Sequence, residues 1–152
     1  NTLEKEPGIP GYVMSSTTMA KTFAERGFGT YVPNEEITEY RPGDIVSMNG
    51  HVWIAIGQCE DGSVVLTHSS PNTGVQISGS MLPGKTTQSY AVAEAAMAKY
   101  FPRCHSFYAT RECALDYRGG NLMHWDLEHG VLTDPDGFVK MGPAEIIDAV
   151  LG

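Results

Sequence analysis

Short stretches of β-branched and aliphatic residues, separated by glycine, asparagine and proline, occupy the middle of the chain. They predict four strands, over residues 45–46, 51–56, 63–68 and 75–77. The links between these strands are short. We therefore expect neighbouring strands to pair in the antiparallel sense and to form one sheet.

Helical patterns flank these strands on both sides. Residues 88–100 are rich in alanine and are followed by Pro102, which is typical of a helix and of the residues just beyond its end. A shorter helix is expected over 15–27, with serine at its N-cap and glycine at its stop. Glycine and proline open a last helix over 142–151.

The remaining segments show no clear period. Residues 28–44 are rich in turn-forming residues, and residues 101–142 are predicted to be loops with one short strand near 121–127. We find no internal repeat, linker or low-complexity tract. The pattern therefore predicts a single α+β domain over residues 1–152, in which an antiparallel sheet packs with helices.

Composition and charge narrow the classes of function. A chain of 152 residues is long enough for one hydrophobic core. Its net charge of −8 and its scattered lysines and arginines argue against nucleic acid as a partner. No apolar run approaches the roughly 18 residues of a membrane helix, so we expect no membrane span. The chain opens at Asn1 without a start methionine or signal peptide, which indicates a mature or trimmed fragment.

Three cysteines leave the redox compartment open. Cys59, Cys104 and Cys113 form no CxxC pair, so the spacing typical of a zinc ribbon is absent. A disulfide between Cys104 and Cys113 would suit an exported protein. Two reduced, buried thiols explain the same two residues equally well.

Two histidines lie on what the pattern predicts to be one β-hairpin. A Pro-Gly-Asp turn at 42–44 precedes its first strand, and an Asp-Gly pair at 61–62 reverses the chain. If the reversal is centred between residues 59 and 60, His51 lies directly opposite His68. Neighbouring imidazoles can serve as a general base and as the group that fixes the tautomer of that base.

Alternation along the first hairpin strand divides its residues between two faces of the sheet. His51 and Trp53 share one face. The branched side chains of Val52, Ile54 and Ile56 share the other face, which we expect to lie against the core.

Other interpretations of the histidines stay open. One interpretation is that each histidine is an incidental polar residue on a half-exposed sheet. Another is that His51 and His68 supply two ligands of a zinc site, although no third ligand is evident beside them. His105, His124 and His129 fall in the irregular segment, and we expect them on the surface or in loops.

Four motifs of the hairpin region carry a resemblance. PGDIV, HVWIAIG, VVLTHSS and GVQIS, all within residues 42–78, resemble the NlpC/P60 family of papain-like cysteine peptidases. The segment SSTTMAKTFAERG is similar to a short helix that follows the catalytic helix of that family. AEAAMAKYFP, NLMHWD and DPDGFVKMGPAEIIDAVL resemble an extension of some members from Gram-positive gut bacteria. The resemblance implies a papain-like core over about 14–80 and a C-terminal helical and irregular extension over about 81–152.

The resemblance also implies roles for particular residues. It places the catalytic histidine at His51 and the residue that orients it at His68. The family's cysteine, at the start of a helix upstream of the Pro-Gly-Asp turn, has no counterpart in residues 1–41. Trp53 stands where the family usually has glycine, so its indole is expected to line or narrow the substrate site. Ser69, next to His68, is also expected to line that site.

Candidates for the missing nucleophile remain within the chain. A rival alignment sets Ser15 in the position of the cysteine. Cys59 is excluded in the hairpin interpretation, because about eight strand residues separate it from His51, or some 25 Å at roughly 3.3 Å per residue. Cys113 follows the two histidines along the chain, as the catalytic cysteine does in circularly permuted relatives of the family. The alternative is that Cys113 is a structural thiol or forms a disulfide.

The function implied by the resemblance is amide hydrolysis in peptidoglycan. The chain would be a cysteine endopeptidase acting on stem peptides, or the histidine-bearing part of one, with no metal or organic cofactor. An upstream segment or a separate chain would carry the cysteine, and the protein would be secreted or associated with the cell wall. The alternative is a non-catalytic wall-binding or structural module derived from the same fold.

Overall fold

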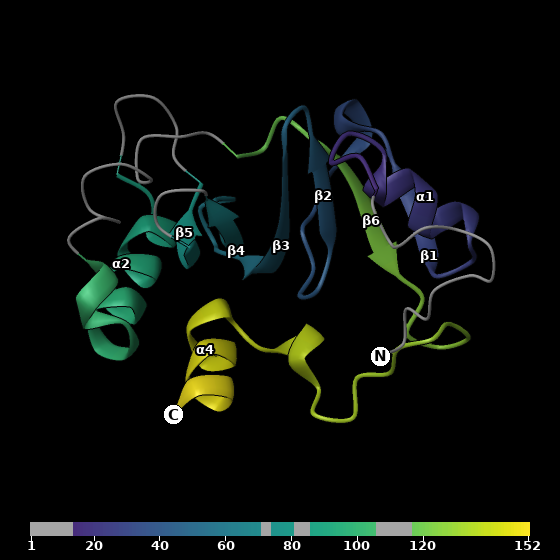
Figure 1. The fold of residues 1–152 in the computed structure, drawn as a ribbon. Helices are drawn as coiled ribbons and strands as arrows, with labels where there is room; N and C mark the ends of the chain where they lie inside the picture. The colour runs from purple at the N-terminus through teal and green to yellow at the C-terminus, as the bar shows by residue number, and fades with distance from the viewer. Residues whose placement is uncertain (1–13, 71–73, 81–85, 106–116) are drawn as a thin grey trace.

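The computed structural model describes residues 14–70, 74–80, 86–105 and 117–152. It shows an α+β fold, in which helices pack against one six-stranded antiparallel sheet (Figure 1). The strand order is β1-β6-β2-β3-β4-β5. The strands are β1 (Gly29–Val32), β2 (Ile45–Met48), β3 (His51–Gln58), β4 (Val64–Ser70), β5 (Gly74–Gly79) and β6 (Asn121–Trp125).

The four strands predicted from the hydrophobic pattern are present as β2 to β5, and each ends two residues later than predicted. Strand β4 begins at Val64, one residue later than predicted. β1 was not predicted, because its residues lie in the turn-rich segment 28–44. Gly29 has no room for a side chain, since a Cβ there would lie 1.8 Å from the carbonyl oxygen of His124. Close pairing with β6, and not a local pattern, therefore makes this segment a strand.

Strand β6 lies between β1 and β2, although it is far from both in the sequence. Its residue Leu122 pairs with Val32 on one side and Val46 on the other. The segment predicted as a C-terminal extension thus contributes an interior strand of the sheet. The strand itself is close to the one predicted near 121–127.

Three helices pack against the sheet: α1 (Met19–Glu25), α2 (Gln88–Tyr100) and α4 (Pro143–Leu151). Helix α2 spans the predicted residues, and α4 begins with proline in its first turn, as predicted. Helix α1 is shorter than predicted, because it begins after Thr18 and not at the serines. Two short 3₁₀ turns, η1 (Asn34–Glu36) and η2 (Phe138–Lys140), and a helical turn at 102–105 complete the described elements.

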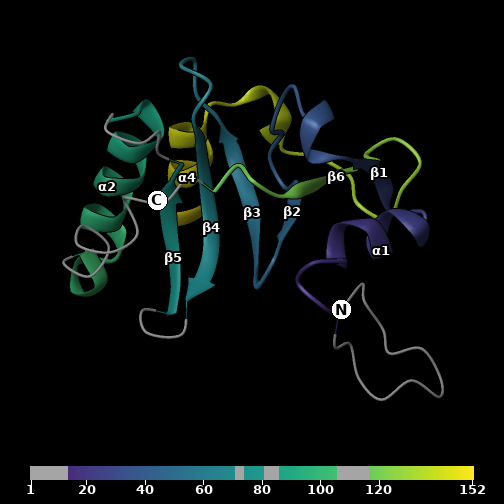
Figure 2. The same cartoon turned by 90° about the horizontal axis from the view of Figure 1, so that it is seen from above.

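The helices contact one side of the sheet, which we call the helix face. Helix α1 lies at the end that carries β1 and β6, and α2 lies at the β5 end (Figures 1 and 2). Phe23 of α1 packs with Ile45 and Met123. At the other end, Val65 and Ile77 pack with α2 and α4, where the cluster includes Ala93, Ala96, Met97 and Ile147.

The opposite side of the sheet carries a buried hydrophobic cluster of the hairpin, and we call it the histidine face. Trp53 is 1% exposed there and packs with Val46, Leu66 and Leu122. Ile54 points to the helix face and is 44% exposed. The prediction that the branched face of the hairpin lies against the core was therefore wrong for Ile54, because the helices cover the two ends of their face more fully than its middle.

Among the described residues, none of the helices combines the length and the apolar character needed to cross a bilayer.

Candidate functional site

The imidazole rings of His51 and His68 contact each other on the histidine face. Nε2 of His51 lies 3.0 Å from Nδ1 of His68, and the ring centroids are 4.9 Å apart with an angle of 82° between the planes. One of these nitrogens must donate a hydrogen bond and the other must accept it. The structure therefore brings together the two histidines that the sequence predicted to be neighbours.

The route by which they meet differs from the prediction. In the ladder between β3 and β4, His68 pairs with Trp53, and His51 pairs with Met48 of β2. The prediction that His51 lies directly opposite His68 was therefore wrong. The reversal of the chain is centred later than predicted, so the histidines are diagonal neighbours, close enough for long or aromatic side chains to touch.

The contact continues onto a third strand. The second ring nitrogen of His68, Nε2, lies 2.9 Å from Oγ of Ser78 in β5. His68 is 6% exposed and Ser78 is fully buried. A line of hydrogen bonds thus runs from His51 through His68 to Ser78 across β3, β4 and β5. Nothing in the local sequence pattern indicated Ser78, because its partner lies in another strand.

Tyr117 packs against both histidine rings. Its ring centroid lies 5.1 Å from that of His68 and 6.0 Å from that of His51. Its carbonyl oxygen accepts a hydrogen bond of 2.9 Å from Nε1 of Trp53. Tyr117 therefore restricts the positions of both imidazoles and ties the segment before β6 to the hairpin.

The second ring nitrogen of His51, Nδ1, differs from Nε2 in its contacts with the described residues. His51 is half-buried, and its Nε2 is engaged by His68. Its Nδ1 has no hydrogen-bond partner among the described residues. An imidazole held through one nitrogen, with the other available, is the arrangement that a general base requires.

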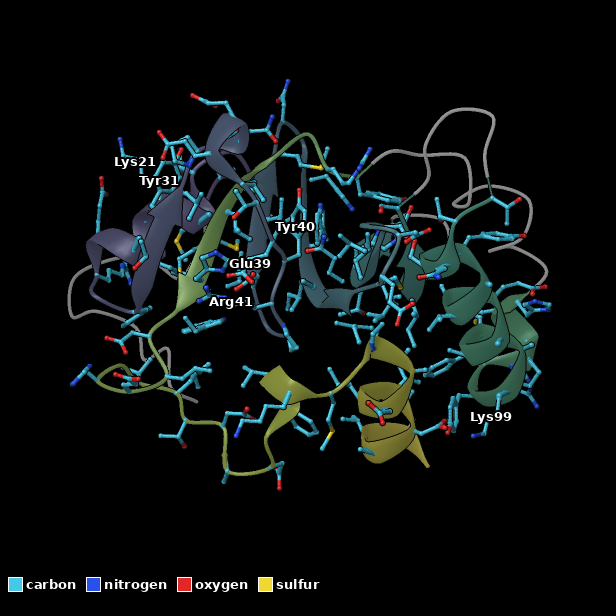
Figure 3. All side chains as sticks on the ribbon, turned by 180° about the vertical axis from the view of Figure 1, so that it is seen from behind. Lys21, Tyr31, Glu39, Tyr40, Arg41 and Lys99 are labelled. Atoms are coloured by element: carbon cyan, nitrogen blue, oxygen red, sulfur yellow. The ribbon has the colours of Figure 1, made fainter. Side chains whose placement is uncertain are left out.

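The two residues expected to line the substrate site are placed elsewhere. Trp53 shares the face of His51 but is enclosed in the core, where its ring packs 5.6 Å from that of Tyr40, which is labelled in Figure 3. Ser69 is exposed, but alternation along β4 points it to the face opposite His68. Trp53 therefore packs in the core beneath His51 and His68, and Ser69 lies on the opposite face of the sheet from these two histidines.

The described cysteines lie away from His51 and His68, on the other face of the sheet. Cys59 and Cys104 are free thiols that pack against the hydrophobic cluster of the helix face. Burial raises the pKa of the Cys59 thiol, which disfavours the reactive thiolate. Cys104 is thus not in a disulfide, and Cys113 lies outside the described residues. Neither Cys59 nor Cys104 is placed to exchange a proton with His51.

The alternative nucleophile, Ser15, lies just before α1. Its Oγ accepts a hydrogen bond of 3.3 Å from the backbone N–H of Thr17. The helix that follows packs on the helix face through Ala20 and Phe23. The alignment that sets Ser15 in the position of the cysteine therefore places its helix on the side of the sheet opposite His51.

A second histidine contact joins the start of β2 to β6. Nδ1 of His124 lies 2.8 Å from Oδ2 of Asp44, and the same oxygen accepts a hydrogen bond of 2.6 Å from the backbone N–H of Arg41. The Asp44 side chain is 2% exposed, and this burial raises its pKa against the lowering effect of His124 and Arg41. Asp44 belongs to the Pro-Gly-Asp turn, so the contact fixes the entry to the hairpin.

The three histidines outside the hairpin differ in their surroundings. The expectation of a surface or loop position was wrong for His124, which lies in β6 and is mostly buried. His105 lies in a helical turn, with Nε2 3.3 Å from Oε1 of Glu94, and His129 is exposed. In the part of the chain that the structure describes, no three His, Cys, Asp or Glu side chains form a group able to hold a metal ion.

Comparison of the chain with protein-family models, with curated proteins and with solved structures finds no match in any of the three. The observations that bear on function are therefore the chain's own motifs, the sheet, and the line of hydrogen bonds from His51 to Ser78.

Proposed function

We propose that this chain carries the base and the orienting group of a papain-like cysteine-peptidase site, in a hydrolase that cleaves amide bonds in peptidoglycan stem peptides. One observation carries the proposal. His51 is held through Nε2 by His68, while its Nδ1 has no hydrogen-bond partner among the described residues.

The chemistry of acyl transfer suits this arrangement. Nδ1 of His51 takes the proton of a cysteine thiol, and the thiolate attacks the amide carbonyl carbon. The imidazolium then gives this proton to the leaving nitrogen, so that the C–N bond breaks, the amine product departs and Nδ1 is again unprotonated. Water, deprotonated by the same nitrogen, then hydrolyses the acyl enzyme. His68 accepts a hydrogen bond from the resulting imidazolium through Nδ1 and keeps the ring oriented throughout.

The resemblance of the hairpin motifs to the NlpC/P60 family supplies the substrate class. The sheet is then the core of a papain-like fold, and the protein is secreted or associated with the cell wall. No metal or organic cofactor takes part in this chemistry.

The nucleophile is assigned to residues outside the described ones. Cys59 and Cys104 pack on the helix face, so neither meets His51. An upstream segment or a separate chain carries the cysteine in this proposal, and Cys113 is the alternative within the sequence. In either case the thiol has to approach Nδ1 of His51 from the histidine face, within about 4 Å in an unliganded state.

The same observation on the cysteines favours a second candidate function. A chain with no thiol beside His51 would be a wall-binding or structural module derived from the peptidase fold. Such a module would retain the partly buried hydrogen bond between His51 and His68 as a structural contact and would bind muropeptides without cleaving them.

Turnover and binding of purified muropeptides separate the two functions. The chain, and a version extended with the residues encoded upstream of Asn1, are incubated with muropeptides, and products are identified by mass spectrometry and by new amino groups. A peptidase whose cysteine lies in this chain or in the segment upstream of it predicts cleavage by at least one version, with His51→Ala lowering the rate by about 10²–10⁴-fold. Binding without cleavage by both versions supports the module. The absence of both cleavage and binding contradicts both candidates.

A further inference from the structure

Both ring nitrogens of His68 lie at hydrogen-bond distance from other side chains. Nδ1 faces Nε2 of His51 at 3.0 Å, and Nε2 faces Oγ of Ser78 at 2.9 Å. A neutral imidazole has one N–H donor and one lone-pair acceptor. If His51 donates to His68, Ser78 therefore has to accept from it, and if His51 accepts, Ser78 has to donate. Two directions of donation along the line are consistent with neutral rings.

In one direction, Nε2–H of His51 donates to Nδ1 of His68, and Nε2–H of His68 donates to Ser78. Nδ1 of His51 then has a free lone pair. In the other direction, Ser78 donates to Nε2 of His68, Nδ1–H of His68 donates to His51, and the proton of His51 lies on Nδ1. Only the first direction leaves His51 able to accept a proton at Nδ1.

The charged form of His51 removes the ambiguity. An imidazolium has a proton on both nitrogens, so its Nε2–H must donate to Nδ1 of His68. His68 then has its own proton on Nε2, which points at a fully buried hydroxyl. A buried N–H without an acceptor costs about as much as a lost hydrogen bond, so an acceptor at this point stabilises the charged state of His51.

We propose that Ser78 is a positioning residue, whose hydroxyl accepts a hydrogen bond from Nε2–H of His68 and thereby keeps His68 in the tautomer that supports His51 as a base. The hydroxyl hydrogen can rotate, while the oxygen lies 2.9 Å from Nε2 of His68 on a fully buried side chain. Its effect on turnover rests on the proposed function, whereas its effect on the tautomer of His68 does not.

Ser80 provides a matched control in the same segment. Its side chain is also buried, but its Oγ accepts a hydrogen bond of 2.8 Å from the backbone N–H of Val64 and does not contact His68. Loss of either hydroxyl removes one buried hydrogen bond. A difference between Ser78→Ala and Ser80→Ala therefore reports on the line of histidines and not on burial alone.

Long-range ¹H–¹⁵N correlation spectra of the ¹⁵N-labelled chain test the proposal at neutral pH, because they distinguish protonated from unprotonated ring nitrogens. We expect His68 to be protonated at Nε2 in the unmodified chain and in Ser80→Ala. In Ser78→Ala we expect a mixture of the two tautomers, and in Ser78→Thr a return to the single tautomer. A proton on Nδ1 of His68 in the unmodified chain, or an unchanged spectrum in Ser78→Ala, overturns the proposal.

If Ser78→Ala does not fold, Ser78→Cys replaces it, because a thiol is a weaker acceptor of similar size. The expected change has the same direction and is smaller, and an unchanged spectrum again overturns the proposal. In a version of the protein that cleaves muropeptides, Ser78→Ala should lower kcat by about 10-fold with KM unchanged. A Ser78-dependent tautomer in a protein without turnover would contradict the proposed peptidase and leave the role of Ser78 standing.

Discussion

Nε2 of His51 reaches Nδ1 of His68 along a diagonal of the sheet, at 3.0 Å, although the residue that pairs with His68 in the ladder is Trp53. Trp53 is enclosed in the core below the two rings. His51 is the first residue of β3 and is half-buried there, while its partner His68 is almost fully buried. One imidazole therefore lies near the surface and the other anchors it.

Replacement of His68 by alanine should destabilise the fold. The change leaves Ser78 and His51 without this partner and opens a cavity, and we expect a loss of about 2–4 kcal/mol in the free energy of unfolding. Urea denaturation measures it. His129→Ala is the control, because His129 is exposed and its loss should cost less than about 0.5 kcal/mol. Equal effects of the two changes would contradict the buried position of His68.

The two tryptophans should respond differently to replacement by phenylalanine. Nε1 of Trp53 donates to the carbonyl of Tyr117 in the core, whereas Nε1 of Trp125 donates to Gly43 at a partly exposed position. Loss of the buried donor removes one hydrogen bond to the carbonyl oxygen of Tyr117 within the core. We expect Trp53→Phe to lower the free energy of unfolding by about 2 kcal/mol and Trp125→Phe by about 1 kcal/mol or less. Denaturant curves that rank them in the reverse order would place Trp53 outside the core.

Burial of Asp44 should be visible in the dependence of stability on pH. Its pKa in the folded protein is raised above 3.8, so the folded state binds more protons than the unfolded state in this range. Stability due to Asp44 is therefore complete below pH 3.8 and falls as the pH rises through the raised pKa, by at most about 1.4 kcal/mol per pH unit.

The comparison of His124→Gln with the double variant His124→Gln, Asp44→Asn isolates this effect, because the titratable partner of Asp44 is absent from both. The single variant should lose stability relative to the double variant as the pH rises, when unfolding is followed at several pH values. The backbone N–H of Arg41 remains available to position 44 in both proteins. A difference that grows in the opposite direction would show that Asp44 has a lowered pKa.

The thiols of Cys59 and Cys104 should be dispensable for any turnover. Both pack on the helix face, away from His51. We expect Cys59→Ser and Cys104→Ser to change the rate of muropeptide cleavage less than about twofold, which is within the usual effect of a site outside the chemistry. Abolition of cleavage by either change would mean that the thiol acts in catalysis and that the placement of His51 is wrong.

Local pattern was sufficient for some elements and not for others. Residues 88–100 form α2 as predicted, because alanine content and the proline beyond its end act within the helix itself. Strand β1 depends on pairing with β6, which is about ninety residues away in the sequence. The pattern of a few neighbouring residues does not reveal such pairing, because the partner strand is distant in the sequence.

For the candidate site as well, local pattern predicted some contacts and missed others. Alternation within β3 and β4 was enough to place His51 and His68 on one face, but it could not fix their register to within two residues. Ser78 and the contact between Asp44 and His124 each join different strands, so no motif spacing indicates them. These contacts become visible only when the strand order of the sheet is known.

The protonation of His51 tests the central claim most directly, because the role of base depends on its Nδ1. Long-range ¹H–¹⁵N spectra of the unmodified chain at a pH where the ring is neutral report which nitrogen has the proton. We predict a proton on Nε2, directed at His68, and an unprotonated Nδ1. A neutral His51 with its proton on Nδ1 would contradict the account, since that nitrogen could not then accept a proton from a thiol.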